Sequence, residues 1–145
     1  MSAEVSVTEA SVPFLIRAGR ESDRPFVESS WKHSASHSAL EAARKPGFHA
    51  AIAERCRRIC ARPHTQVRIA CIPGDEDAIL GWAIVELAVV HYTYVRRDAR
   101  RQGIARALLV DLIDPSTTPV VVYTNQPLYR GLKLPPHWRH NENLE

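Results

Sequence analysis

The chain has 145 residues, a size that fits one domain with a single hydrophobic core. Hydrophobic residues make up 45% of it and charged residues 24%, which is typical of a globular protein and excludes a disordered or fibrous one. The longest apolar stretches, such as residues 83–90, are interrupted by Glu86 and are shorter than the ~20 residues of a membrane helix, so we expect no membrane span. The net charge of +3 favours an anionic partner without separating a nucleotide cofactor from nucleic acid.

The N-terminal segment and the cysteines favour a cytoplasmic protein. Residues 1–12 lack the basic start and apolar middle of a secretory signal, and we predict a flexible lead-in there. Cys56, Cys60 and Cys71 are odd in number and lack the dense spacing of disulfide-stapled domains, so we expect all three to be reduced. Because the sequence contains no repeat or linker, we expect one domain over residues 1–145.

The first half of the chain predicts one strand and two helices. A short β-favouring run covers residues 14–17, and Ser22 to Pro25 then offers a cap and a proline suited to a first helical turn. We expect that helix to continue through Trp31 and to loosen or break in the polar run 34–38. Apolar residues recur at spacings of three and four over residues 48–60, which predicts the clearest amphipathic helix.

The second half predicts a β-hairpin, a glycine loop and a proline-rich tail. Strands are expected at residues 66–72, 79–87, 89–95 and 119–123, with a turn at 73–77. A helix is expected at residues 104–112, ended by Asp114-Pro115. In the shortened C-terminal segment 126–145 we expect a turn at 128–132 and an edge strand at 137–140. This order indicates an α/β (α+β) fold, with a mixed sheet and helices on its faces.

The loop from Arg100 to Arg106 has the features of a pyrophosphate site. A helix that begins directly after a strand offers several backbone N–H groups and a favourable dipole to an anion. Gly103 leaves the backbone free of a Cβ, and Ala105 keeps the next turn small. Arg100, Arg101 and Arg106 add positive charge.

These residues resemble the cofactor motif of the Gcn5-related N-acetyltransferase (GNAT) superfamily, which is Gln or Arg, two residues, Gly, one residue, then Gly or Ala. Arg100, Gly103 and Ala105 fill this pattern. The resemblance extends over roughly residues 14–132, with Tyr94-Val95 before the loop and residues 79–82 similar to the preceding strand. Residues 29–32 and 91–95 look most like short members encoded by phages and prophages, which would place the protein in the host cytoplasm.

The resemblance implies a GNAT-like, mostly antiparallel twisted sheet with helices on both faces, and acetyl-CoA as the cofactor. Asn125 would contact the pantetheine arm, or else cap the next turn, and a backbone N–H near Val95 would stabilise the oxyanion. The implied cofactor-binding residues are Tyr94, Val95, Arg100, Arg101, Gln102, Gly103, Ile104, Ala105, Arg106 and Asn125.

His91 is the first candidate for the general base. Alternation along the strand puts it on the same face as Thr93 and Val95, and an imidazole titrates near neutral pH. Its position resembles that of a histidine involved in proton removal in arylalkylamine acetyltransferases, although a structural histidine is an equal alternative. Glu86, at the end of the preceding strand, is the alternative base, and otherwise a solvated acid. Tyr129 resembles the family's general acid.

Other patterns are weaker. His33 with His37, and Cys56 and Cys60 with His64, have helical spacings of four, but small core thiols are the better explanation and we predict no metal. The sequence therefore favours an N-acetyltransferase that transfers acetyl to a primary amine in a ternary complex, as a monomer or homodimer. The alternatives are a non-catalytic CoA-binding or nucleic-acid-associated phage accessory module, or a GNAT-fold enzyme that modifies DNA bases.

Overall fold

The computed structural model describes residues 13–38, 40–123 and 134–141. Its strands form one sheet in chain order, in which β1 to β4 are antiparallel, β5 is parallel to β4, and β6 is parallel to β5. The strands are β1 (Leu15–Ala18), β2 (Thr65–Ile72), β3 (Asp75–Glu86), β4 (Val89–Val95), β5 (Val121–Tyr123) and β6 (Trp138–His140). The predicted mixed, mostly antiparallel sheet is confirmed.

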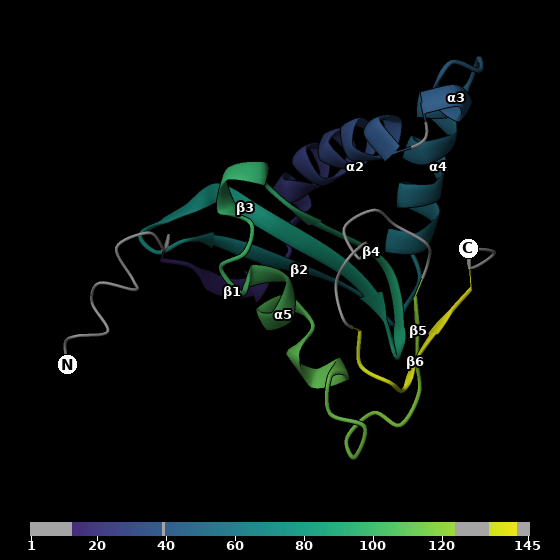
Figure 1. The fold of residues 1–145 in the computed structure, drawn as a ribbon. Helices are drawn as coiled ribbons and strands as arrows, with labels where there is room; N and C mark the ends of the chain where they lie inside the picture. Colours follow the sequence, from purple (N-terminus) through teal and green to yellow (C-terminus); the bar gives the residue numbers. More distant parts are fainter. Residues whose placement is uncertain (1–12, 39, 124–133, 142–145) are drawn as a thin grey trace.

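Helices cover both faces of this sheet. The helices α2 (Arg24–Ser38), α3 (Leu40–Ala43) and α4 (Phe48–Cys60) lie on one side, and α5 (Ile104–Leu108) lies on the other (Figure 1). Short 3-10 turns occur at η1 (Glu21–Asp23), η2 (Arg97–Ala99) and η3 (Val110–Leu112). None of the helices within the described ranges has the length and apolar character needed to cross a membrane.

The break predicted at residues 34–38 is wrong, because α2 continues as a helix through Ser38. The serine hydroxyls there bond within the helix or to the sheet. Ser36 donates to the carbonyl of Lys32 at 2.8 Å, and the hydroxyls of Ser34 and Tyr92 lie 2.9 Å apart. Serines that satisfy their hydroxyls this way can remain inside a helix, so tertiary contacts override the weak local propensity.

Other element boundaries also differ from the sequence-based expectation. Strand β3 begins at Asp75, because the turn needs only Pro73 and Gly74, the latter with φ of 82°. The helix expected at 104–112 is divided into α5 and η3, with Leu109 between them. The tail strand is present as Trp138–His140, whereas the turn predicted at 128–132 lies outside the described residues.

The side of the sheet that faces α2 and α4 is filled by large aromatic rings. Trp31 of α2 stacks on Tyr92 of β4 with ring centroids 4.9 Å apart, and Trp82 lies beside both. The indole N–H of Trp82 donates to the Ser30 hydroxyl at 2.8 Å. Since Trp82 is fully buried, this bond satisfies the one polar atom of the ring. The aromatic cluster fixes α2 against β3 and β4.

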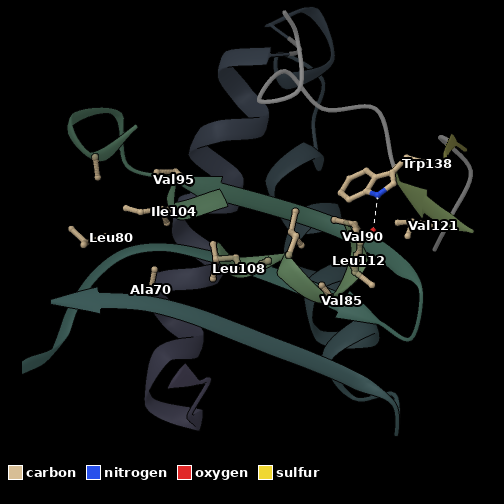
Figure 2. Packing of buried hydrophobic residues seen from close by; sticks show 13 residues of the cluster. Ala70, Leu80, Val85, Val90, Val95, Ile104, Leu108, Leu112, Val121 and Trp138 are labelled. Atoms are coloured by element: carbon tan, nitrogen blue, oxygen red, sulfur yellow. Dashed lines mark hydrogen bonds between the residues drawn. The ribbon is translucent and has the colours of Figure 1, made fainter. Parts of the chain in front are cut away.

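The other side of the sheet packs against α5 and η3, and the side chain of Trp138 from β6 joins the same cluster (Figure 2). Ile104 and Leu108 of α5 and Leu112 of η3 cover buried residues of β3 and β4. The indole N–H of Trp138 donates to the carbonyl of Leu112 at 3.0 Å, the bond drawn in Figure 2. These contacts pack the start of α5 against the end of β4, where Ile104 and Val95 belong to the same cluster.

A buried ion pair joins β1 to η1, the turn directly before α2. Arg17 donates to both carboxylate oxygens of Asp23, at 2.8 and 2.9 Å, and the backbone N–H of Arg20 donates to the same carboxylate. The bonds from Arg17 lower the pKa of Asp23 below its usual value of 3.8, against the effect of burial. The charged carboxylate is therefore stabilised in the native state.

Replacing Asp23 with asparagine is expected to lower the free energy of unfolding at pH 7 by about 3 kcal/mol, because Arg17 keeps a buried charge without its counterion. The folded-state pKa of Asp23 is depressed, so the pair contributes its full stability above pH 3.8 and loses it as the pH falls through the folded-state value. Urea unfolding at pH 7 and in acid measures this. A gap between wild type and Asp23→Asn that does not shrink in acid would contradict it.

Candidate functional site

The loop between β4 and α5 has an unusual backbone. Arg101 and Gly103 both have positive φ, 64° and 82°. A backbone of this kind makes neighbouring N–H groups converge, which favours anion binding, and the first N–H groups of α5 have no partner within the helix. A Cβ added to Gly103 would meet no atom within 4 Å, so the space beside this backbone is open. The loop residues thus suit an approaching phosphate.

The arginines of this loop have different roles. The Nε atom of Arg100 donates to the carbonyl of Val95 at 2.9 Å, which ties the loop to the end of β4. Arg101 and Arg106 are exposed beside the start of α5. Ala105 packs against the core below α5 rather than facing solvent fully. Arg100 therefore anchors the loop to β4, whereas Arg101 and Arg106 add positive charge to its exposed surface.

The pairing between β4 and β5 is described at the start of β4. In the described part of the chain, the two strands pair at Val89 with Val122 and at Val90 with Tyr123. The rest of β4, up to Val95, runs past the described end of β5 toward the loop. The sequence analysis predicts the backbone N–H that stabilises the oxyanion in this segment, near Val95. The segment lies beyond the described pairs with β5.

A bulge in β4 corrects the predicted direction of His91. Val90 lies opposite Val85 and Tyr92 opposite Ile84, so His91 is an extra residue on its strand. His91 is bonded to Glu86 on the α4 side of the sheet, whereas Val95 packs on the α5 side. The prediction that His91 shares a face with Val95 is therefore wrong, because a bulge resets the alternation of side chains.

His91 and Glu86 form one unit instead of being rival candidates. The Nε2 atom of His91 lies 2.9 Å from Oε1 of Glu86, and Arg62, just after α4, donates to the same oxygen at 3.0 Å. The imidazole is 2% exposed, while the Glu86 side chain is 23% exposed. The structure thus places a carboxylate, partly open to solvent, between a buried imidazole and a guanidinium group.

The ionisation of the pair follows from these contacts. The hydrogen bond from His91, followed by Arg62, lowers the pKa of Glu86, so its carboxylate is charged. Burial lowers the pKa of His91 even though Glu86 opposes this, so the imidazole is neutral near pH 7. Because a carboxylate only accepts hydrogen bonds, Nε2 of His91 carries the proton. The basic lone pair is therefore on Nδ1, and Glu86 orients the ring.

Several predicted residues stand apart from this cluster. Tyr94 lies on the aromatic side of the sheet, with its ring centroid 5.9 Å from that of Trp82. Tyr129 and Asn125 lie outside the described residues. Arg62 was missed by the sequence analysis, because it follows α4 without any motif and meets Glu86 only through the fold. Arg62 lies in the short connection between α4 and β2, where no sequence pattern indicates a functional residue.

The cysteine pair on α4 behaves as a pair of thiols in the protein interior. Cys56 is fully buried and Cys60 partly so. Their mutual hydrogen bond lowers the pKa of Cys60 to about 7, against burial, and raises that of Cys56. Across residues 13–38, 40–123 and 134–141, no group of three histidine, cysteine or acidic residues is arranged to hold a metal.

Comparison with known proteins gives a fold match at low sequence identity. No protein-family model matches the sequence, and no curated protein matches it significantly. Among solved structures, YjaB of Escherichia coli in its apo form is similar with a TM-score of 0.53, 18% identity, and coverage of 76% of this chain and 69% of YjaB. A transcriptional regulator from Bacillus halodurans C-125 has a TM-score of 0.54, 14% identity and coverage of 83% and 87%.

A third similar structure contains a ligand. AAC(6')-Iy, solved in complex with the bisubstrate analogue CoA-S-monomethyl-acetylneamine, has a TM-score of 0.50 with 16% identity. The alignment covers 88% of this chain and 94% of that protein. At such identities the matches establish the shared fold, and the roles of individual residues here depend on the geometry described above.

Proposed function

We propose that this chain, which has the fold of the GNAT superfamily, is an acetyl-CoA-dependent N-acetyltransferase with a primary amine as acceptor. The observation that carries the proposal is that one strand, β4, connects a neutral, carboxylate-oriented histidine to a loop suited to a pyrophosphate. Val95 and His91 are four residues apart, about 13 Å along a strand. A cofactor lying along β4 would bring its two ends to these two places.

The loop residues would hold the cofactor through its phosphates. The N–H groups around Gly103 and Ile104 would donate to the pyrophosphate, and Arg101 and Arg106 would supply charge. When bound, acetyl-CoA supplies an activated acyl group as a thioester. The part of β4 near Tyr94 and Val95, beyond its described pairing with β5, would bind the pantetheine arm and polarise the thioester carbonyl.

His91 would remove the proton during transfer. The amine nitrogen forms a bond to the acyl carbon while the carbon–sulfur bond breaks, and Nδ1 of His91 accepts the ammonium proton, directly or through water. Glu86 and Arg62 would hold the ring and balance its charge. The leaving thiolate takes a proton from Tyr129 in this proposal, with Asn125 beside the cofactor arm.

A second function, a non-catalytic module that binds CoA, is favoured by the burial of His91, whose ring is 2% exposed behind Glu86. The Bacillus halodurans protein with this fold is called a transcriptional regulator. Thiol release measured with acetyl-CoA and a panel of amines separates the two functions. Saturable release that needs both substrates supports the enzyme, and binding of acetyl-CoA without release supports the module.

Cofactor binding has its own expected result. Acetyl-CoA should raise the melting temperature, because it binds only the native state. Arg101→Ala should weaken binding about five- to tenfold through the loss of one charged phosphate contact. Arg57→Ala, which removes an exposed arginine of α4, is the matched control and should bind like wild type. An equal loss in both variants would contradict a role specific to the loop.

A further inference from the structure

The last turns of α4 place two thiols on the same face of the helix. Cys56 is fully buried in the cluster of α2, α4 and the aromatic rings, whereas Cys60, the last residue of α4, is partly exposed. Residues four apart on a helix are neighbours, and these two thiols are hydrogen-bonded to each other. The pair therefore has one sulfur in the interior and one toward the surface.

The more exposed thiol, that of Cys60, lines a pocket of about 190 Å³ that is open to solvent. The pocket lies between η1 and the start of α2 on one side and the end of α4 and β2 on the other. Val27 and Val67 give it apolar walls, and Arg24 lines it as well. A small molecule can thus reach Cys60, whereas the third cysteine, Cys71, is fully buried in β2.

The surroundings of Cys60 favour its thiolate. The hydrogen bond from Cys56, helped by the charge of Arg24, lowers the pKa of Cys60 to about 7 against the effect of burial. A thiol with that pKa is about half thiolate at pH 7, whereas an ordinary cysteine with a pKa near 8.5 is only about 3% thiolate. The thiolate is the form that attacks disulfides.

A disulfide between the two cysteines of α4 does not fit the helix. The Cβ atoms of residues four apart on a helix are about 5–6 Å from each other, and a disulfide needs about 3.5–4.5 Å. Closing this bond would distort the last turn of α4. Cys60 is therefore suited to react with a molecule from outside, while Cys56 supports its thiolate from the interior.

We propose that Cys60 is a thiol-exchange site, at which small disulfides such as cystine or 2-hydroxyethyl disulfide enter the pocket and form a mixed disulfide with the protein. The Cys60 thiolate attacks one sulfur of the small disulfide, the bond between Sγ and that sulfur forms, and the original sulfur–sulfur bond breaks. The other half leaves as a thiolate and takes a proton from water. Cys60 is oxidised and the small disulfide is reduced, so the step needs no further oxidant.

The size of the pocket limits the partner. Pockets for drug-sized ligands are typically about 300–1,000 Å³, so the space beside Cys60 suits a molecule of a few heavy atoms on each side of the disulfide. In the described part of the chain, the pocket lining shares no residue with the loop before α5 or with the cluster of His91, Glu86 and Arg62. The thiol site is thus independent of acetyl transfer.

The experiment measures how fast 2-hydroxyethyl disulfide, which is small and uncharged, adds to Cys60 at pH 7 in the native protein and in protein unfolded in urea. The larger thiolate fraction of native Cys60 speeds the reaction, and the lower basicity of its sulfur takes back about fivefold. We expect the native rate to be about threefold higher than the unfolded rate. Peptide mass spectrometry locates the adduct, and Cys56 and Cys71 should be modified only in urea.

Oxidised glutathione tests the role of the pocket. Each half of this disulfide is a tripeptide, too large for the space beside Cys60, so it should react more slowly with native than with unfolded protein. A native rate that exceeds the unfolded rate equally for both disulfides would overturn the pocket as the site of entry.

Variants connect the reactivity to the thiol pair. Cys56→Ala removes the hydrogen bond and should reduce the native-to-unfolded ratio from about three to about one. Cys71→Ala, which removes a buried cysteine of β2, is the matched control and should keep the wild-type ratio. If circular dichroism shows that Cys56→Ala is unfolded, Arg24→Gln replaces it, with the exposed Arg57→Gln as control. Arg24→Gln should also lower the ratio.

The possible results divide clearly. An adduct confined to Cys60, formed faster in the native protein and slowed in Cys56→Ala, supports the proposal. A native rate at or below the unfolded rate, or equal labelling of all three cysteines in the native protein, overturns it. Loss of two hydrogens without an adduct would reveal a Cys56–Cys60 disulfide and also overturns it, as does a Cys56→Ala variant that keeps the wild-type ratio.

Discussion

Replacing His91 with alanine is expected to lower kcat/KM for acetyl transfer by about a hundred- to a thousandfold, the usual contribution of a positioned general base. Acetyl-CoA should still raise the melting temperature, because the cofactor loop is about four residues further along β4. Steady-state thiol release at saturating acetyl-CoA measures the loss. His64→Ala, which removes an exposed histidine, is the control and should keep wild-type activity.

The pH dependence tests the role of Glu86 in the same reaction. Burial lowers the pKa of His91 below the usual 6.5, while Glu86 raises it. The rate should therefore fall only below pH 6.5, where His91 becomes protonated and can no longer accept a proton. Glu86→Gln should move this acid limb to lower pH, because the raising effect is lost. A limb that stays in place in Glu86→Gln, or full activity in His91→Ala, would remove the pair from the reaction.

The largest expected effect on stability comes from Trp82. This side chain is fully buried and touches Trp31, Tyr92 and Tyr94. Trp82→Ala should lower the free energy of unfolding by about 3–5 kcal/mol through lost burial and the cavity left behind. At this chain length the change corresponds to a drop in melting temperature of about 10 °C or more. Thermal and urea unfolding measure it.

Trp82→Phe separates packing from the hydrogen bond to Ser30. Phenylalanine keeps an aromatic ring but cannot donate to the Ser30 hydroxyl, so we expect about half of the loss seen for alanine. Because Trp82 and Ser30 link β3 to α2, the alanine variant should also loosen the α2 side of the site around His91. A loss below about 1 kcal/mol for Trp82→Ala would show that the aromatic cluster adjusts without cost.

The regular parts of the fold could be predicted from local patterns. The apolar spacing that starts at Phe48 predicted α4, and the β-favouring runs predicted the hairpin and β4. The glycine loop was predicted from Gly103 and its arginines, because a tight turn before a helix depends on neighbouring residues. These features have their causes within a few positions of sequence, and the structure contains those elements.

The arrangement around His91 could not be predicted in this way. A bulge depends on the register between two strands, and no residue in 89–95 marks it. The contact between Arg62 and Glu86 joins residues 24 positions apart, and the guanidinium of Arg55 on α4 lies over the ring of Trp31 on α2. The continuation of α2 past Ser34 likewise depends on Tyr92, a residue of the sheet. Each of these contacts exists only once the chain has folded.

The extra residue in β4 gives the strand two phases. From Tyr92 to Val95 the side chains alternate in one phase, and at Val90 in the other. Strict alternation would put Val90 among the aromatic rings and the imidazole beneath α5. The number of residues between Glu86 and Tyr92, more than their identity, thus determines the side of the sheet on which the His91 side chain lies. A variant that lacks one residue between Glu86 and Tyr92 would lose the bulge, so the remaining side chains of this segment would point to the opposite side of the sheet.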